Sequence, residues 1–272
     1  MNRLFVGVGA VLVLIAIGAY FWFQQAPQKR PAPAPAPVVS PPAVAPKEPA
    51  IRHPVEAPPG ATELPPLEKS DEFIRERLTE LLGAKAVKTY IRIENFARRV
   101  VATVDNLSRS LAPPRMWPIH PTPGRFTVAD AEGGSVIGTR NAARYAPFVA
   151  LVESVDTGRA VALYRLLYPL FQRAYESLGS PGKYFNDRLL EVIDLLLDTP
   201  DPSGPLKVEL PKIEGPRKPT HPWVLYRYSD PDLESLACGQ KILLRVGREN
   251  ERRLKAKLAE IRRLIAGDNL SR

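Results

Sequence analysis

Proline usage constrains this chain more than any other feature of its sequence. Between Pro27 and Pro66 lie 14 of the 30 prolines, including the alternating run Pro31–Pro37. Proline fixes the backbone angle φ and lacks an N–H donor, so such a segment favours extended polyproline II over helix or sheet. We therefore predict a disordered Pro/Ala-rich linker over residues 27–69, which leaves the hydrophobic core to the residues that follow. A passive spacer is its simplest role, and a ligand for proline-binding modules is the alternative.

An apolar segment precedes this linker. Residues 4–23 read LFVGVGAVLVLIAIGAYFWF and carry no charge. At 1.5 Å per residue, a helix of this length spans about 30 Å, the thickness of the hydrocarbon core of a bilayer. The segment ends in the bulky residues Tyr20–Phe23, which suit an aromatic belt at the headgroups and not a signal-peptide cleavage site. We therefore predict a single-pass transmembrane anchor over residues 1–26, with the inner membrane as a partner through residues 4–23.

The charges that flank the apolar segment indicate its direction only weakly. Arg3 precedes the segment and Lys29 and Arg30 follow it, so the two flanks are nearly balanced. The short N-terminal flank favours a cytoplasmic N-terminus and an exported remainder. A stiff spacer after a membrane helix suits a domain that works at a distance, as in a bacterial periplasm. We therefore expect a bacterial inner-membrane protein with its globular domain in the periplasm.

Residues 70–267 are predicted to form one globular domain, followed by a tail over residues 268–272. The length of this region is sufficient to bury a sizeable core without disulfides, and the single cysteine, Cys238, cannot form an intrachain disulfide. Apolar periodicity and turn residues predict helices over residues 71–82, 91–107, 142–153, 156–178 and 186–198, a short helix from residue 230 and a long helix over residues 240–266. Short strands are predicted over residues 125–129, 135–138, 207–210 and 224–228. The expected fold class is mainly α with a few short β-strands (α+β).

Helix starts and interruptions are also predicted. Ser70 is expected to cap the first helix with its hydroxyl, because acidic residues follow it at the positive end of the helix dipole. Gly83 is expected to end this helix. Pro169 is expected to kink the helix over residues 156–178, because it removes one backbone hydrogen bond.

Four carboxylates recur at intervals that place them on one face of the helix over residues 186–198. They are Asp187, Glu191, Asp194 and Asp198. A solvated face is the simplest interpretation, and a docking face for a basic partner is the next. Divalent-metal binding or paired-carboxylate catalysis is a weaker alternative, because catalytic carboxylates usually converge from different elements.

Positive charge is concentrated at the C-terminal end of the chain. From Lys241 onward there are ten basic and four acidic residues, a net +6 of the total +9. Five basic residues fall on one predicted stripe of the last helix: Arg245, Arg248, Arg252, Lys255 and Arg262. A solvated face, pairing with the acidic helix, and contact with an anionic envelope polymer or membrane surface are all open interpretations. No aromatic residues alternate with these cations, so we expect no nucleic-acid partner.

Catalytic and metal-binding motifs fail on inspection. The three histidines lie beside prolines or in proline-rich loops without HExxH spacing, and no phosphate-binding glycine loop occurs. Ser180–Lys183 fits the S-x-x-K pattern of penicillin-binding enzymes, but Pro181 and Gly182 favour a turn where that chemistry requires a helix. We interpret Cys238 as a small core or helix-junction residue and not as a nucleophile. No cofactor or metal is predicted.

Several blocks of the sequence resemble an uncharacterised family of proteobacterial proteins, domain of unknown function 3014 (DUF3014). The similar blocks are Phe96–Leu107 (FARRVVATVDNL), Leu163–Tyr175 (LYRLLYPLFQRAY), Tyr184–Leu197 (YFNDRLLEVIDLLL) and Gln240–Gly247 (QKILLRVG). The similarity covers residues 70–266, and the agreement of separate blocks in order is more specific than any single motif. The resemblance implies a bacterial origin and favours a periplasmic domain. It brings no known activity and no catalytic residue.

Three functional hypotheses follow. The first is a non-catalytic envelope protein whose tethered domain binds another protein or a cell-wall component. The second is an envelope hydrolase or transferase that uses carboxylates such as Asp105 or Asp187, which requires both of them in one concave pocket with an arginine or tyrosine. The third is a regulatory or chaperone-like partner of a membrane complex, which requires an exposed apolar groove.

Overall fold

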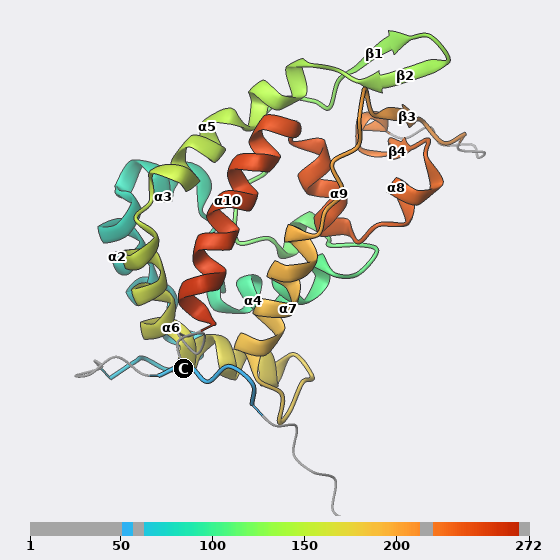
Figure 1. Cartoon of the computed structure of the whole chain (residues 1–272). Helices are drawn as coiled ribbons and strands as arrows, with labels where there is room; N and C mark the ends of the chain where they lie inside the picture. The colour runs from blue at the N-terminus through green and yellow to red at the C-terminus, as the bar shows by residue number, and fades with distance from the viewer. Residues whose placement is uncertain (1–50, 57–62, 213–219, 267–272) are drawn as a thin grey trace, which may run out of the picture. The chain divides into compact units, whose positions relative to one another are not determined.

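The computed structural model describes residues 51–56, 63–212 and 220–266 (Figure 1). The predicted anchor over residues 1–26 and most of the predicted linker lie outside this range. Among the helices that are described, none combines the length and the apolar character that a membrane span requires.

Helices make up most of the described chain. They are α2 (Asp71–Leu82), α3 (Ala84–Tyr90), α4 (Phe96–Leu107), α5 (Arg140–Ser154), α6 (Thr157–Ser177), α7 (Phe185–Leu197), α8 (Pro231–Ser235), α9 (Cys238–Arg245) and α10 (Arg248–Ile265). Three 3₁₀ turns are η1 (Leu67–Lys69), η2 (Pro114–Met116) and η3 (Pro222–Val224). The strands β1 (Val128–Ala131), β2 (Gly134–Ile137), β3 (Lys207–Glu209) and β4 (Arg227–Tyr228) form one antiparallel sheet in the order β1-β2-β3-β4. The prediction of a mainly α domain with a few short strands is confirmed.

The helical region packs around α6 and α10. The largest cluster of buried side chains joins α2, α4 and α6, with Ile74, Val101 and Leu170 inaccessible to solvent. The helix α10 lies between α5 and α7 and packs against both (Figure 1). The sheet forms a separate end of the domain, where Val208, Tyr228 and Leu244 of α9 make a smaller cluster.

The predicted long C-terminal helix is wrong, because Gly247 divides it into α9 and α10. Gly247 has φ = 91°, in the left-handed region that favours glycine. A Cβ atom at this position would lie 2.8 Å from the Cβ of Ala142, so the close approach to α5 also requires glycine. Apolar periodicity continues through the break, which explains why the pattern predicted one helix.

The predicted helix over residues 91–107 begins later, at Phe96. Ile91 instead pairs with Ile119 in an isolated β-bridge, and Asn95 adopts the left-handed conformation with φ = 55°. The preceding residues form α3, which the sequence pattern did not predict. The carboxylate of Asp71 accepts hydrogen bonds from the amides of Asn95 (2.7 Å) and Phe96 (3.1 Å), and so caps α4 from another helix.

The predicted capping role of Ser70 is wrong, although α2 begins after it and ends before Gly83 as expected. The Ser70 hydroxyl donates to the carbonyl of Leu67 (2.8 Å) and makes no capping bond to α2. Cys238 is buried, as predicted, at the contact of α9 with the end of α4, where its thiol lies 3.3 Å from the carbonyl oxygen of Asn106.

Candidate functional site

The acidic residue Asp187 binds a segment that the sequence assigned to the linker. Its two carboxylate oxygens accept hydrogen bonds from the amides of Arg52 (3.1 Å) and His53 (2.9 Å). The neighbouring Asn186 donates to the carbonyl of His53 (2.9 Å), and the Tyr184 hydroxyl accepts from the amide of Val55 (2.7 Å). The start of α7 therefore holds residues 51–56 against the domain, and the Asp187 carboxylate is occupied by this contact.

The other acidic residues of α7 lie in different environments. Glu191 pairs with Arg52 at 2.5 Å and with Arg188 at 3.4 Å. Asp194 pairs with Arg262 of α10, where Nη2 donates to Oδ2 at 3.1 Å. Asp198 is exposed and makes no ion pair within the described residues. Asp187, Glu191 and Asp194 lie on α7 and Asp198 directly follows its last residue, and the four carboxylates do not converge on one site.

The five basic residues do not form one continuous stripe, because the break at Gly247 places Arg245 on α9 and the others on α10. Arg248 donates to Asp201 (2.7 Å) and to the carbonyl of Pro202 (3.0 Å). Arg252 is exposed and pairs with Glu249 (2.5 Å) on its own helix.

Direct contact between the acidic and basic helices occurs at few points. Arg262 pairs with Asp194, and the ammonium group of Lys255 donates to the carbonyl of Thr199 (2.5 Å), just beyond the end of α7. The two charged faces that the sequence predicted therefore pair only in part. Most of their side chains instead hold loops of the domain in place.

A polar cleft of about 560 Å³ brings together the carboxylates of the hydrolase hypothesis. Asp105, Asp187 and Tyr175 line this cleft, together with Arg188. The Asp105 carboxylate pairs with Arg109 (2.5 Å) and Arg188 (3.2 Å). The predicted convergence of Asp105, Asp187, an arginine and a tyrosine is therefore present. Both carboxylates, however, are engaged by hydrogen bonds or ion pairs within the chain.

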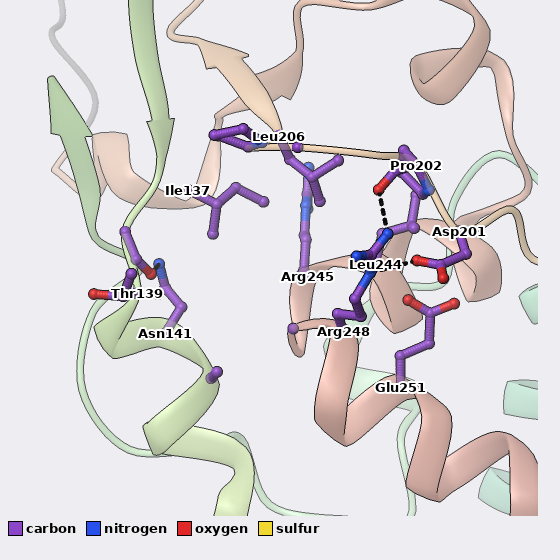
Figure 2. Close-up of a pocket in the computed structure, with 15 residues that line it drawn as sticks. Ile137, Thr139, Asn141, Asp201, Pro202, Leu206, Leu244, Arg245, Arg248 and Glu251 are labelled. Atoms are coloured by element: carbon purple, nitrogen blue, oxygen red, sulfur yellow. Dashed lines mark hydrogen bonds and ion pairs between the residues drawn. The ribbon is translucent and has the colours of Figure 1, made fainter. Parts of the chain in front are cut away.

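A second pair of carboxylates lies where α9 meets α10, in a pocket of about 410 Å³ that we call the carboxylate pocket. In Figure 2 the carboxylates of Asp201 and Glu251 face each other beside Arg248, which donates to Asp201. Glu251 is 5% exposed. Burial raises the pKa of the Glu251 carboxyl above its ordinary value; the hydrogen bond from Lys255 opposes this rise and the charge of Asp201 adds to it. The sequence pattern did not predict Glu251 as a site residue.

An aromatic cleft of about 420 Å³ lies beside the sheet. Five of its lining residues are aromatic and half-buried: Trp117, Phe126, Tyr145, Trp223 and Tyr226. Both tryptophans of the described chain are among them. The rings of Phe126 and Tyr226 pack at a centroid distance of 5.6 Å. The sequence did not predict this site, because its members come from loops and a helix that lie far apart along the chain.

Polar side chains fix the walls of the aromatic cleft. Arg144 of α5 donates to the carbonyls of Pro123 (3.0 Å) and Gly124 (3.2 Å). Arg125 stacks on Trp223, with its guanidinium carbon 4.2 Å from the ring centroid. Arg245, one of the predicted basic residues, donates to the carbonyl of Tyr226 (2.8 Å) and so supports the same wall. The rings are therefore held in position before any ligand binds.

Within the described residues, no three side chains of histidine, cysteine, aspartate or glutamate gather closely enough to hold a metal ion. The carboxylate pocket and the polar cleft both contain arginines, whose charge opposes that of a cation.

The comparisons with known proteins extend this description. No curated protein and no solved structure matches the chain. The model of one protein family, described as "Protein of unknown function (DUF3014)", matches residues 96–262. The match runs from the start of α4 into α10, and therefore contains the sheet and the aromatic cleft. The chain belongs to the DUF3014 family, as its sequence blocks predicted.

Proposed function

We propose that this chain is a membrane-tethered, non-catalytic binding protein of the bacterial envelope, and that the aromatic cleft is its recognition site. The charge-free run over residues 4–23 supports a membrane anchor, and the proline-rich linker supports a domain that works away from the bilayer. The direction of the anchor, with the domain in the periplasm, rests on the short N-terminal flank.

The aromatic cleft carries the proposal because of the kind of surface that it offers. Tryptophan, tyrosine and arginine contribute most of the binding energy at protein interfaces. Aromatic-lined grooves also bind extended proline-rich segments, whose polyproline II conformation is already ordered before binding. We therefore assign an extended, proline-containing polypeptide of the envelope as the ligand class.

Catalysis is the second candidate, and the carboxylate pocket favours it. A buried carboxyl with a raised pKa beside a second carboxylate is an arrangement that general acids use. Such a site would act on an envelope component as a hydrolase or transferase. Against this candidate, Arg248 pairs with Asp201, and Lys255 lies 3.2 Å from the Glu251 carboxylate. A regulatory or chaperone-like role would need an accessible apolar surface.

Binding of a synthetic peptide of alternating alanine and proline to the full chain in nanodiscs tests the proposal. We expect Trp223→Ala to weaken binding by about tenfold or more, the loss typical of an aromatic anchor. Tyr90→Ala is a matched control, because Tyr90 is half-buried and packs on Phe148 outside the cleft. A chain that lacks residues 31–49 removes competition from its own prolines. Equal binding by all variants, or no binding even without that segment, would reject the aromatic cleft as a proline-binding site.

A further inference from the structure

The interior of the helical region is divided into several clusters of buried side chains. The largest surrounds α6 and includes Leu167 and Phe185. Two smaller ones lie on α10, one with Val161 and Leu190 and the other with Val192 and Leu196. A cavity of about 400 Å³ lies between them, walled by α2, α4, α6, α7 and α10. We call this space the apolar cavity.

The lining of the apolar cavity is hydrocarbon almost throughout. Among the described residues that line the cavity, Tyr164 alone has a polar side-chain atom. Its hydroxyl donates to the Oδ1 atom of Asn186 at 2.8 Å and is therefore occupied. The cavity thus offers no free donor or acceptor from a side chain, so a ligand that fills it must be apolar along its buried length.

The size of the apolar cavity makes an unfilled state unfavourable. Protein interiors contain few voids larger than a water molecule, and the destabilisation from a void grows with its volume. An engineered apolar cavity of about 150 Å³ stays dry and binds benzene. The apolar cavity here exceeds that volume and lies within the range of about 300–1,000 Å³ for small-molecule sites. Water is a poor occupant because it finds no hydrogen-bond partners among the side chains.

We propose that the apolar cavity binds a single fatty acyl chain. The lining residues Phe185, Leu167 and Val192 are at most 2% exposed and form the floor of the cavity. Ten of the twenty lining residues are only half-buried, so the cavity is open to solvent on one side. A helix about 10 Å wide fills about 400 Å³ with each turn, so the apolar cavity would hold no more than about one turn, whereas an unbranched hydrocarbon chain fits within the same volume. Val104, Leu189 and Ile261 are half-buried lining residues, and they mark where the cavity reaches the surface. The apolar cavity is a separate site from the aromatic cleft. The proposal rests on the proposed membrane anchor only where the acyl chain belongs to a lipid of the bilayer.

Photo-crosslinking tests this proposal on the full chain in phospholipid nanodiscs. One arm contains a trace of phospholipid with a diazirine in its acyl chain, and the other contains diazirine-labelled palmitate. We expect crosslinks on cavity residues such as Leu189 and Leu258, mapped by mass spectrometry. Labelling by both probes indicates a general acyl-chain site. Labelling by palmitate alone indicates that the source is free fatty acid rather than bilayer lipid.

Cavity-filling variants supply the control. Val104→Phe and Ala160→Phe place a ring inside the cavity, and we expect them to abolish crosslinking of the cavity residues, because the ring occupies the space that the acyl chain would fill. Val224→Phe adds a ring at a position that is 65% exposed and does not line the cavity, and is expected to leave the crosslinks of the cavity residues unchanged. Circular dichroism checks folding, and Ala160→Val replaces any variant that does not fold. Absence of cavity crosslinks in both arms, or crosslinks that persist in the filled variants, would overturn the proposal. Trp223→Ala leaves the crosslinks unchanged, which separates this test from that of the aromatic cleft.

Discussion

The helical region and the sheet end of this domain are stabilised in different ways. In the helical region, apolar side chains such as Phe185 and Leu170 pack between helices. The sheet end has strands of two to four residues, and a few polar side chains hold its loops. Asn141, which is 1% exposed, bonds to both the amide (3.1 Å) and the carbonyl (2.5 Å) of Thr127. In a packed core, the loss of stability grows with the volume of the side chain that is removed. Removal of a buried polar side chain such as that of Asn141 instead leaves several buried hydrogen-bonding groups without partners at once.

The largest effect is expected in the helical region, from Phe185→Ala. Phe185 is inaccessible to solvent and its ring packs against those of Phe171 and Tyr175. Removal of a buried phenylalanine ring is expected to lower the free energy of unfolding by about 3–5 kcal/mol. Urea unfolding followed by circular dichroism measures this change. Leu178→Ala, at an exposed position in the same region, serves as the control. A loss below about 1 kcal/mol, the typical effect of any substitution, would show that the ring is not part of a tight core.

The next effect is expected from Asn141→Ala at the sheet end. The substitution removes the partners of Thr127 and also the hydrogen bond to the carbonyl of Gly138 (3.1 Å). Buried groups left without partners cost about 1–3 kcal/mol. The walls of the aromatic cleft should loosen with them, so affinity for an alanine–proline peptide is expected to fall together with the melting temperature. Asn106→Ala removes a side-chain bond inside α4 instead, and is expected to leave the cleft intact. If the affinity of the Asn141 variant for the peptide is unchanged, the hydrogen bonds of Asn141 do not support the walls of the aromatic cleft.

Gly247→Ala tests the junction between the two regions. The substitution adds strain at a positive φ and places a Cβ atom 2.8 Å from that of Ala142. We expect a loss of about 1–3 kcal/mol in the free energy of unfolding. Gly83→Ala is the matched control, since Gly83 has φ = 82° but nothing within 4 Å of the added atom. Equal losses in the two variants would mean that only backbone strain matters and that the approach of α5 to the junction can relax.

Sequence periodicity predicted the helices whose apolar faces are regular, such as α6 and α7, and the approximate place of every strand. It missed α3 and the break at Gly247, because neither interrupts the pattern of apolar residues. The capping of α4 by Asp71 depends on a contact between separate helices, which no local pattern contains.

The candidate sites show a similar division. The sequence correctly grouped Asp187, Glu191 and Asp194 on one helix, but their partners are fixed by tertiary contacts: Arg52 for the first two and Arg262 for the third. The aromatic cleft combines Trp117 and Trp223 from distant loops. Charge spacing along a helix predicts a shared face, whereas convergence on a site requires knowledge of how the loops return to the domain.

The smallest effect is expected from Glu251→Gln, which tests whether the carboxyl group of Glu251 makes the stability of the domain depend on pH. Burial raises the pKa of Glu251 in the folded state above the ordinary value of 4.5. The folded state therefore binds the proton more tightly than the unfolded state, so the contribution of Glu251 to stability is fully present below pH 4.5 and is lost as the pH rises through the folded pKa. The free energy of unfolding, measured across this pH range, is expected to decline as the pH rises and to decline less in Glu251→Gln. Glu249→Gln, at an exposed position of the same helix, is expected to show the same pH dependence as the parent chain. If Glu251→Gln and the parent chain show the same pH dependence, the carboxyl is not perturbed, and the candidate general acid of the carboxylate pocket loses its support.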